Sequence, residues 1–220
     1  MPALIMPALA IALLGCNGQT ETDAVQSTAS NSADDAPPPP PADVDVPLPV
    51  LPEGPTQDVK VEGSTIQFTG AKVTGSHDGA FAKFSGQVIV KDDAVVATAF
   101  TIDLSSTTVE PPKLAKHLMS KDFFHVEKYG NAQFVSSSIT PAKNPGAVTH
   151  KVDGVLALHG KTRPLSFPAS ITVGATETTV TATFDINRQN WGVSYPGKPD
   201  DLIKDDVEVR LNLTFPEAAQ

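Results

Sequence analysis

The chain has 220 residues, 40% of them hydrophobic and 19% charged, which is enough for one globular domain with a real core. Its formal net charge of -9 argues against a nucleic acid partner, because phosphate binding needs a basic face. A single cysteine excludes an internal disulfide and a cysteine-rich zinc site.

Residues 1–16 have the features of an export signal. The apolar run 8–15 is too short to cross a bilayer as a helix but suits the apolar region of a signal peptide. With the next residue it ends in Leu-Leu-Gly-Cys, which resembles the cleavage box of bacterial lipoproteins, where the cysteine is acylated and becomes the mature N-terminus. An ordinary signal peptide with an incidental cysteine is the alternative. The lipoprotein interpretation predicts lipidation at Cys16.

A lipid on Cys16 also predicts a location. The exported chain would be held on the periplasmic side of a membrane by its anchor. Asn17 follows the cysteine. In the lipoprotein resemblance, a residue other than Asp at this position indicates sorting to the outer membrane, and we therefore expect an outer-membrane lipoprotein if the source is a Gram-negative bacterium.

Residues 17–58 differ in composition from the rest of the chain. Polar and small residues come first, followed by five prolines at 37–41 and four more before residue 56. Such a stretch buries too little apolar surface to offset its ordering entropy, and the proline run favours extended polyproline II. We expect a disordered, proline-rich tether, and a proline ligand for a partner domain is the alternative.

From Val59 to Phe215 apolar and polar residues alternate with period two. This pattern predicts antiparallel strands with one apolar face and one wet face, and the many Thr and Val residues support strands. The apolar positions of the clearest runs are Ile66 and Phe68; Val88 and Val90; Phe100, Ile102 and Leu104; Leu156 and Leu158; Leu165 and Phe167; Ile171 and Val173; Val180, Ala182, Phe184 and Ile186; and Val207, Val209, Leu211, Leu213 and Phe215.

One short helix interrupts this pattern, in residues 113–119. Pro111 and Pro112 suit a helix start, and Leu114 and Leu118 lie four apart on one face. About eight strands with one apolar face each favour a closed barrel, because closure removes exposed edges. A two-sheet sandwich gives the same periodicity and stays an alternative. We therefore predict an all-β domain over residues 59–216.

Several segments, in order along this domain, carry motifs of a known family. Residues 113–129 resemble the signature of the YceI-like domain family, a short helix followed by two phenylalanines and a Lys-Tyr pair, although Gly130 stands where the family usually has proline. Further matches are Gly79–Gly86 at the entry to the second strand, Ala132–Phe134, Gly154–Leu165 in a hairpin, Ile186–Val193 with its Ile-Asn-Arg, and Asp201–Val207 before the closing strand.

The resemblance implies an extended lipocalin-like, eight-stranded antiparallel barrel with one short helix. Members of the family are often exported, and some bind polyisoprenoids or related long-chain amphiphiles in a central pore. The resemblance supplies no common catalytic residues. It implies no cofactor, and a bound isoprenoid or quinone as the ligand.

The residues themselves indicate no enzyme. None of the five histidines has a spacing that would place two rings on one metal. No serine lies in a Gly-x-Ser-x-Gly motif, and the paired aspartates at 200–201 and 205–206 are typical of a solvated charge run. We expect neither catalysis nor a bound metal.

Large apolar residues on the inward face are the candidates for binding a ligand. The simpler interpretation is that most of them fill a core. Small inward neighbours such as Ala182, Gly86 and Gly154 would leave room between them. The candidate pore residues are Phe68, Phe84, Phe100, Ile102, Phe134, Leu156, Phe167, Ala182, Phe184 and Trp191, and we expect Phe124, Trp191 and Tyr195 to border the mouth.

Three functions fit these observations. The first is an anchored protein, monomeric or homodimeric, that binds a long-chain amphiphile such as a polyisoprenoid for transport, storage or stress response. The second is a structural or protein-binding lipoprotein with a filled barrel. The third is an enzyme acting on an isoprenoid lipid. Bound lipid, a co-purifying partner or lipid turnover would distinguish them.

Overall fold

A computed structural model describes residues 45–143 and 146–217. The predicted signal peptide with Cys16 and the part of the predicted tether before residue 45 lie outside these residues. The described part of the chain belongs to one compact unit. Within it no helix is long and apolar enough to cross a membrane.

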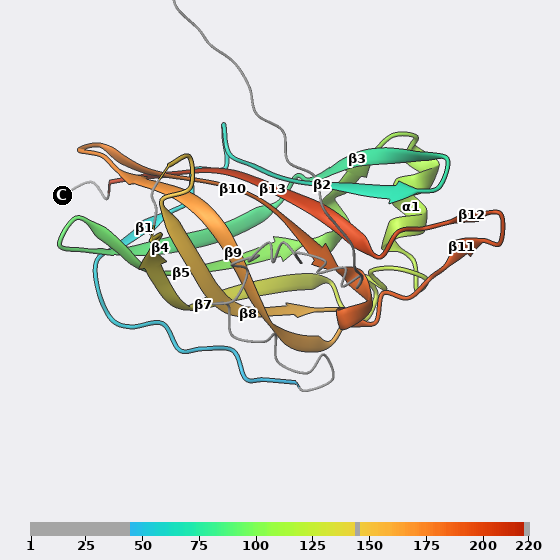
Figure 1. Ribbon diagram of the computed structural model, residues 1–220, viewed down its shortest axis with the longest axis horizontal. Helices are drawn as coiled ribbons and strands as arrows, with labels where there is room; N and C mark the ends of the chain where they lie inside the picture. The colour runs from blue at the N-terminus through green and yellow to red at the C-terminus, as the bar shows by residue number, and fades with distance from the viewer. Residues whose placement is uncertain (1–44, 144–145, 218–220) are drawn as a thin grey trace, which may run out of the picture. The chain divides into compact units, whose positions relative to one another are not determined.

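The alternating segments form an antiparallel sheet (Figure 1). Their β-branched and aromatic residues pack well on a pleated surface with one buried face. In the described chain the order across this sheet is β1-β4-β5-β7-β8-β9-β10-β13-β2-β3-β6, and β11 and β12 form a separate ribbon. The strands are β1 Thr56–Asp58, β2 Thr65–Lys72, β3 Gly75–Phe81, β4 Phe84–Lys91, β5 Ala94–Asp103, β6 Thr107–Val109, β7 Asn131–Pro141, β8 His150–Leu158, β9 Lys161–Val173, β10 Glu177–Asn187, β11 Gly197–Lys198, β12 Asp201–Leu202 and β13 Asp206–Pro216.

The sheet curls into the predicted barrel. β3 and β4 are two halves of one bent strand, and a 3-10 turn, η1 (Leu104–Ser106), joins β5 to β6 in the same way. With each bent strand counted once and the three-residue β1 set aside, the described wall has eight strands in chain order. β2 pairs with both β3 and β13 and closes the wall. This closure decides between the barrel and the sandwich, which the periodicity alone left open.

A second set of contacts seals the far half of the barrel. The N–H of Val59 donates to the carbonyl of Gly86 in β4, and the N–H of Lys60 donates to the carbonyl of Thr214 in β13, both at 2.8 Å. The chain after β1 therefore bridges the two strands where β2 no longer lies between them. The backbone of Val59 and Lys60 thus connects β4 to β13 across this seam.

The register directs the alternating apolar side chains inward. β10 and β13 pair over eleven residues, with Val180 opposite Leu213 and Ala182 opposite Leu211. Leu213 and Phe215 are fully buried, and they belong to the main core. Because side chains alternate across a strand, the polar residues between them face solvent.

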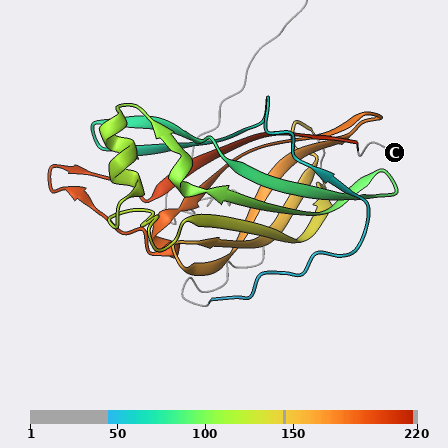
Figure 2. The same cartoon turned by 180° about the vertical axis from the view of Figure 1, so that it is seen from behind.

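The short helix that the sequence predicts is present as α1 (Pro112–Met119), and it covers one end of the barrel. Both views place it at the same end as the β11–β12 ribbon (Figures 1 and 2). A 3-10 turn at that end, η2 (Arg188–Trp191), leads from β10 toward the ribbon. A smaller core cluster, which includes Leu104, Leu158 and Trp191, fills the space beneath these elements.

The last part of the predicted tether lies against the barrel. Residues 45–55, called the strap below, follow the outer wall to β1 (Figure 1). Asp45 forms an ion pair with Arg163 and accepts a hydrogen bond from the Thr162 N–H at 2.8 Å. At the other end of the strap the Val90 N–H donates to the Pro55 carbonyl. These contacts offset the ordering entropy that composition alone predicts to dominate.

Candidate ligand-binding cavity

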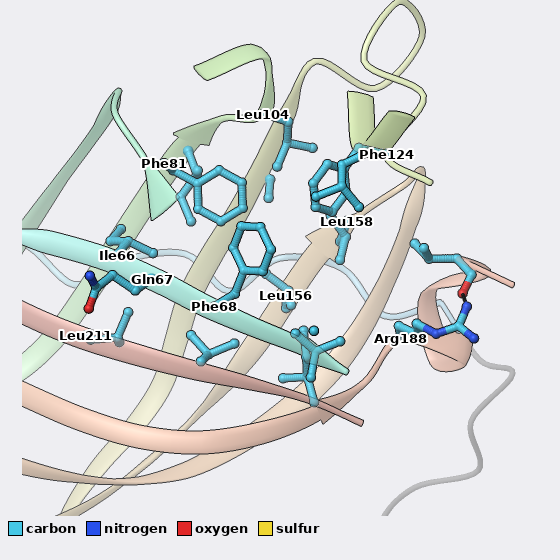
Figure 3. A pocket seen from close by; sticks show the side chains of 18 of the residues that line it. Ile66, Gln67, Phe68, Phe81, Leu104, Phe124, Leu156, Leu158, Arg188 and Leu211 are labelled. Atoms are coloured by element: carbon cyan, nitrogen blue, oxygen red, sulfur yellow. Dashed lines mark hydrogen bonds between the residues drawn. The ribbon is translucent and has the colours of Figure 1, made fainter. Parts of the chain in front are cut away.

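An elongated cavity of about 800 Å3 lies inside the barrel. Its volume falls within the range of about 300–1,000 Å3 that is typical of pockets for small organic ligands. Side chains from β2, β5 and β7 to β10, and from β13, form its wall. In Figure 3, Phe68, Phe81 and Phe124 extend toward one another inside the barrel, and Arg188 lies apart at one end.

The inward apolar side chains do not fill this space. Leu156, Phe184 and Leu211 face the lumen, yet each remains partly accessible rather than fully buried. A plugged core would bury them completely, as the main core does Phe215 at 0% exposure. The barrel is therefore open over part of its length and closely packed elsewhere.

Three inward glycines explain how a barrel with so many phenylalanines keeps a lumen. Gly79 lies directly opposite Phe68, and Gly86 directly opposite Phe100. A Cβ atom on Gly79 would come within 2.3 Å of the Phe68 ring, and one on Gly86 within 2.3 Å of the Phe100 ring. Gly154 relates to the Phe134 ring in the same way, at 2.5 Å. The edge of each ring thus occupies the space that a side chain on the glycine would take.

The rings also contact one another in clusters. Phe167 stacks on Phe184 with centroids 4.3 Å apart and contacts Phe134 at 5.4 Å. Phe68 and Phe81 lie 5.3 Å apart at their centroids, and Phe124 completes a cluster of three. Such clusters present rigid apolar surface whose ordering cost is met by the fold rather than by the ligand.

Polar groups are rare along this wall. Thr98 is the one Ser or Thr among the described residues that line the cavity. Its hydroxyl donates to the Gln87 carbonyl at 2.9 Å, so its proton is already engaged. The lumen thus favours a hydrocarbon chain over a polar molecule, because a polar group there would lose its hydrogen bonds to water.

The end of the cavity beneath α1 is aromatic. Leu114 and Leu118 of α1 line the cavity, as does His117. The His117 ring packs against Phe123 and Tyr195, with centroids 5.0 and 5.1 Å away. These ring contacts join α1 to the chain after η2 and form one side of the opening.

Charged residues gather at the same end. Lys72, Lys113, Arg188, Lys198 and Asp201 line this part of the cavity. Lys72 is paired with Asp201. In the part of the chain that is described, no ion pair joins Lys113 or Lys198 to a carboxylate. Lys113 and Lys198 therefore place positive charge at the opening of a protein whose formal net charge is -9.

Arg188 has a structural role at this end. Its side chain is almost fully buried, and it donates to the carbonyls of Val193 and Lys204 and to Asp205 Oδ1, the last at 3.0 Å. Burial lowers its pKa below the ordinary value, and the neighbouring carboxylate of Asp205 opposes that shift. The guanidinium fork thus holds η2 to the chain between β12 and β13.

Seven of the ten predicted pore residues line the cavity, and three do not. Phe84 packs in the main core and borders a separate cavity of about 470 Å3. Ala182 faces inward, but its short side chain stays within the core beside Leu211. Trp191 is buried in η2, where its indole N–H donates to the Leu156 carbonyl at 2.8 Å. The seven are Phe68, Phe100, Ile102, Phe134, Leu156, Phe167 and Phe184.

Of the residues expected near the mouth, Phe124 and Tyr195 line the cavity. The sequence analysis missed Lys72 and Lys198. Lys198 belongs to a charged, proline-containing stretch that has no alternation to mark it as a strand, and neither lysine differs in sequence from a solvated surface residue. Leu114 and Leu118 had a signal in their spacing of four, which predicts a shared apolar face.

No metal centre is present among the residues that the structure describes, since no three His, Cys, Asp or Glu side chains gather in a group that could hold an ion. The geometry defined by the described residues is that of an apolar tunnel with a charged, aromatic end.

A family model matches most of the chain. It is that of the YceI-like domain, and it covers residues 58–215. This chain belongs to the YceI-like domain family. The matched range agrees with the barrel and leaves out the strap and the residues before it. The motifs that indicate the family in the sequence include α1, the β8–β9 hairpin and η2, which meet at the charged end of the barrel.

Relatives of this YceI-like domain include Pseudomonas proteins named UPF0312. A UPF0312 protein of Pseudomonas putida is 30% identical over 139 residues, which cover 60% of this chain and 71% of the relative. A UPF0312 protein of Pseudomonas fluorescens is 32% identical over 128 residues, covering 54% of this chain and 64% of the relative.

Two solved structures share the fold. Burkholderia cenocepacia BcnA matches with a TM-score of 0.64 and 26% identity, covering 71% of this chain and 98% of that one. A polyisoprenoid binding domain from Saccharophagus degradans matches with a TM-score of 0.59 and 14% identity, covering 76% of this chain and all of that domain. At this identity the second match establishes the shared fold alone.

Proposed function

We propose that this protein binds a long-chain amphiphile, such as a polyisoprenoid, inside its barrel. The observation that carries the proposal is the open, apolar lumen of about 800 Å3, whose inward side chains remain partly accessible. Each methylene that leaves water for this wall contributes about 0.8 kcal/mol, so a long chain gains affinity without any specific polar contact. The Saccharophagus degradans domain, described as polyisoprenoid binding, supports this class of ligand.

The proposal includes an anchored carrier or store on the periplasmic side of the outer membrane. Its support is the lipoprotein-like sequence ending at Cys16 and the proline-rich stretch that follows. An apolar ligand has to be shielded whenever it leaves a bilayer, and a closed wall with a dry interior does this. The protein would act as a binding protein rather than an enzyme, since the one Ser or Thr hydroxyl that lines the lumen among the described residues, on Thr98, is engaged by a carbonyl.

Native mass spectrometry of the full chain purified from membranes tests ligand binding. We expect a population heavier than the polypeptide by the mass of a lipid, released on denaturation. An unliganded protein with a co-purifying partner would favour the structural lipoprotein, and lipid turnover would favour an enzyme. Either result would contradict the proposal.

A matched pair of variants tests whether the lumen is the site. Leu211→Trp adds an indole to the inward face of β13, beside the small Ala182, and should sharply reduce lipid occupancy because it takes up the volume that the chain needs. Asn212→Trp adds the same group to the exposed face one residue away and should leave occupancy unchanged. Equal occupancy in the two variants, with equal thermal midpoints, would place the ligand outside the barrel.

A further inference from the structure

Two exposed aliphatic side chains lie beside the charged end of the barrel. Val73, in the β2–β3 turn, is 71% exposed, and Leu202, in β12, is 51% exposed. The N–H of Val73 donates to the carbonyl of Leu202 at 3.1 Å, so the two residues lie on touching segments of backbone. They are called the apolar rim below.

Polar contacts hold the apolar rim in place. Asp201 pairs with Lys72 and accepts hydrogen bonds from the Thr74 N–H at 3.1 Å and hydroxyl at 2.9 Å. The Lys204 N–H donates to the Ala71 carbonyl at 2.8 Å. The turn and the ribbon are therefore held together as one unit. Their two aliphatic side chains remain exposed to water, which is unfavourable for apolar surface.

The rim borders the cavity. Lys72 and Asp201, which adjoin Val73 and Leu202 in sequence, both line it, and so does Lys198 of β11. Lys113 lines it from α1. An apolar ligand that enters or leaves at this end passes the rim and these exposed lysines.

The strap begins at this same end. Asp45 is held at the start of β9 by Thr162 and Arg163, next to the β8–β9 turn. Leu158, the last residue of β8, packs with Phe124 beneath α1. Asp45, which lies 29 residues after Cys16 in the sequence, is therefore held at the end of the barrel where the rim lies.

We propose that the apolar rim docks on the surface of an anionic lipid bilayer, with Val73 and Leu202 entering the headgroup region and Lys113 and Lys198 facing anionic headgroups. The charge favours this partner, since both lysines lack an ion pair within the described residues. A docked barrel would exchange its ligand with the bilayer without exposing it to water. This inference rests on the proposed lipid-binding function.

Vesicle co-sedimentation tests the docking surface. The full chain carrying Cys16→Ser, which removes the contribution of an acyl anchor, is mixed with vesicles of phosphatidylcholine alone or with phosphatidylglycerol. We expect binding to the mixed vesicles, and a loss of about tenfold in Val73→Asp/Leu202→Asp, because association with a membrane surface scales with the apolar area inserted. Val50→Asp, at a strap position that is 93% exposed, is the matched control and should bind as the parent does.

The charge on the rim is tested separately. Lys113→Gln and Lys198→Gln should each weaken binding to the mixed vesicles about fivefold and leave binding to phosphatidylcholine vesicles unchanged. Asp200, exposed at the tip of the ribbon, opposes the attraction, so Asp200→Asn should strengthen binding. Parent protein that sediments with neither vesicle, or rim variants that bind as the parent does, would overturn the docking surface.

Lipid occupancy separates this inference from the proposed function. Native mass spectrometry of detergent-purified Val73→Asp/Leu202→Asp should show the lipid occupancy of the parent, because neither residue lines the lumen. If the variant retains its lipid and still binds vesicles as the parent does, the docking surface is wrong and the proposed function stands. A parent protein without lipid contradicts the proposed function itself.

Discussion

At the scale of single residues, three glycines set the width of the lumen. Gly79, Gly86 and Gly154 leave the wall thin where an aromatic ring from the neighbouring strand lies over it. The barrel thus combines large apolar rings with open volume, two properties that compete when every inward residue has a side chain. Gly79 offers the clearest test of the three, because the three atoms that a Cβ on this glycine would approach most closely all belong to the Phe68 ring.

Gly79→Ala should turn the Phe68 ring into the lumen. We expect lower lipid occupancy by native mass spectrometry and a stability loss of about 1–3 kcal/mol in urea denaturation, as for other overpacked sites. Gly75→Ala, in the same strand with open space around it, is the control for the substitution itself. Phe68→Leu combined with Gly79→Ala should restore occupancy, and a double variant as empty as the single one would contradict the role of the pair.

Residue periodicity predicts which face of a strand is inward but not how far a side chain reaches. Phe68, Phe100 and Phe134 line the cavity as the alternation suggests. The side chain of Ala182 points inward but does not reach the lumen, because larger neighbours such as Leu211 on the paired strand lie between them. That neighbour is set by the pairing of β10 with β13, and periodicity within one strand contains no information about its partner.

At the scale of elements, the helix and most wall strands follow from local pattern, while the strap and the ribbon do not. The strap has a composition typical of disordered chain, and two specific contacts order its start, those of Asp45 with Thr162 and Arg163. Both partners lie more than a hundred residues away in sequence. The two-residue strands of the β11–β12 ribbon are too short for any alternation to mark them.

The strap should detach in acid. The Thr162 N–H, followed by the charge of Arg163, lowers the pKa of Asp45 below its ordinary value of 3.8, against partial desolvation. A lowered folded-state pKa means that the carboxylate stabilises the strap above pH 3.8 and that this contribution disappears as the pH falls through the folded value. The amide chemical shift of Thr162 should therefore titrate with a midpoint below 3.8.

Asp45→Asn is the control for this titration. It removes the charge at every pH, so the Thr162 amide shift should no longer show the transition, and the strap should be loosened at neutral pH as well. A midpoint at or above 3.8 in the parent protein, or the same titration in the variant, would show that another group controls the strap.

At the scale of the whole molecule, attachment to the membrane is predicted to depend on one atom. Cys16→Ser removes the sulfur that would be acylated and should move the protein from the membrane fraction to the soluble periplasmic fraction. Asn17→Ser changes the neighbouring residue and should leave the protein in membranes. Immunoblots of both fractions measure the distribution, and a Cys16→Ser protein that stays with membranes in high salt would rule out the lipid anchor.

The order of the wall strands also bears on how the barrel assembles. Each wall strand from β2 to β13 pairs with its neighbour in the chain, so nearly every hairpin can form locally. The exception is the pairing of β13 with β2, where Ile66 lies opposite Leu211 although the two residues are 145 positions apart in the sequence. Joining such distant segments has a large loop-closure entropy, so we expect this pairing to form late in folding. Until then we expect an open sheet without an enclosed interior, so that a ligand of the kind proposed here would be enclosed only when β13 pairs with β2.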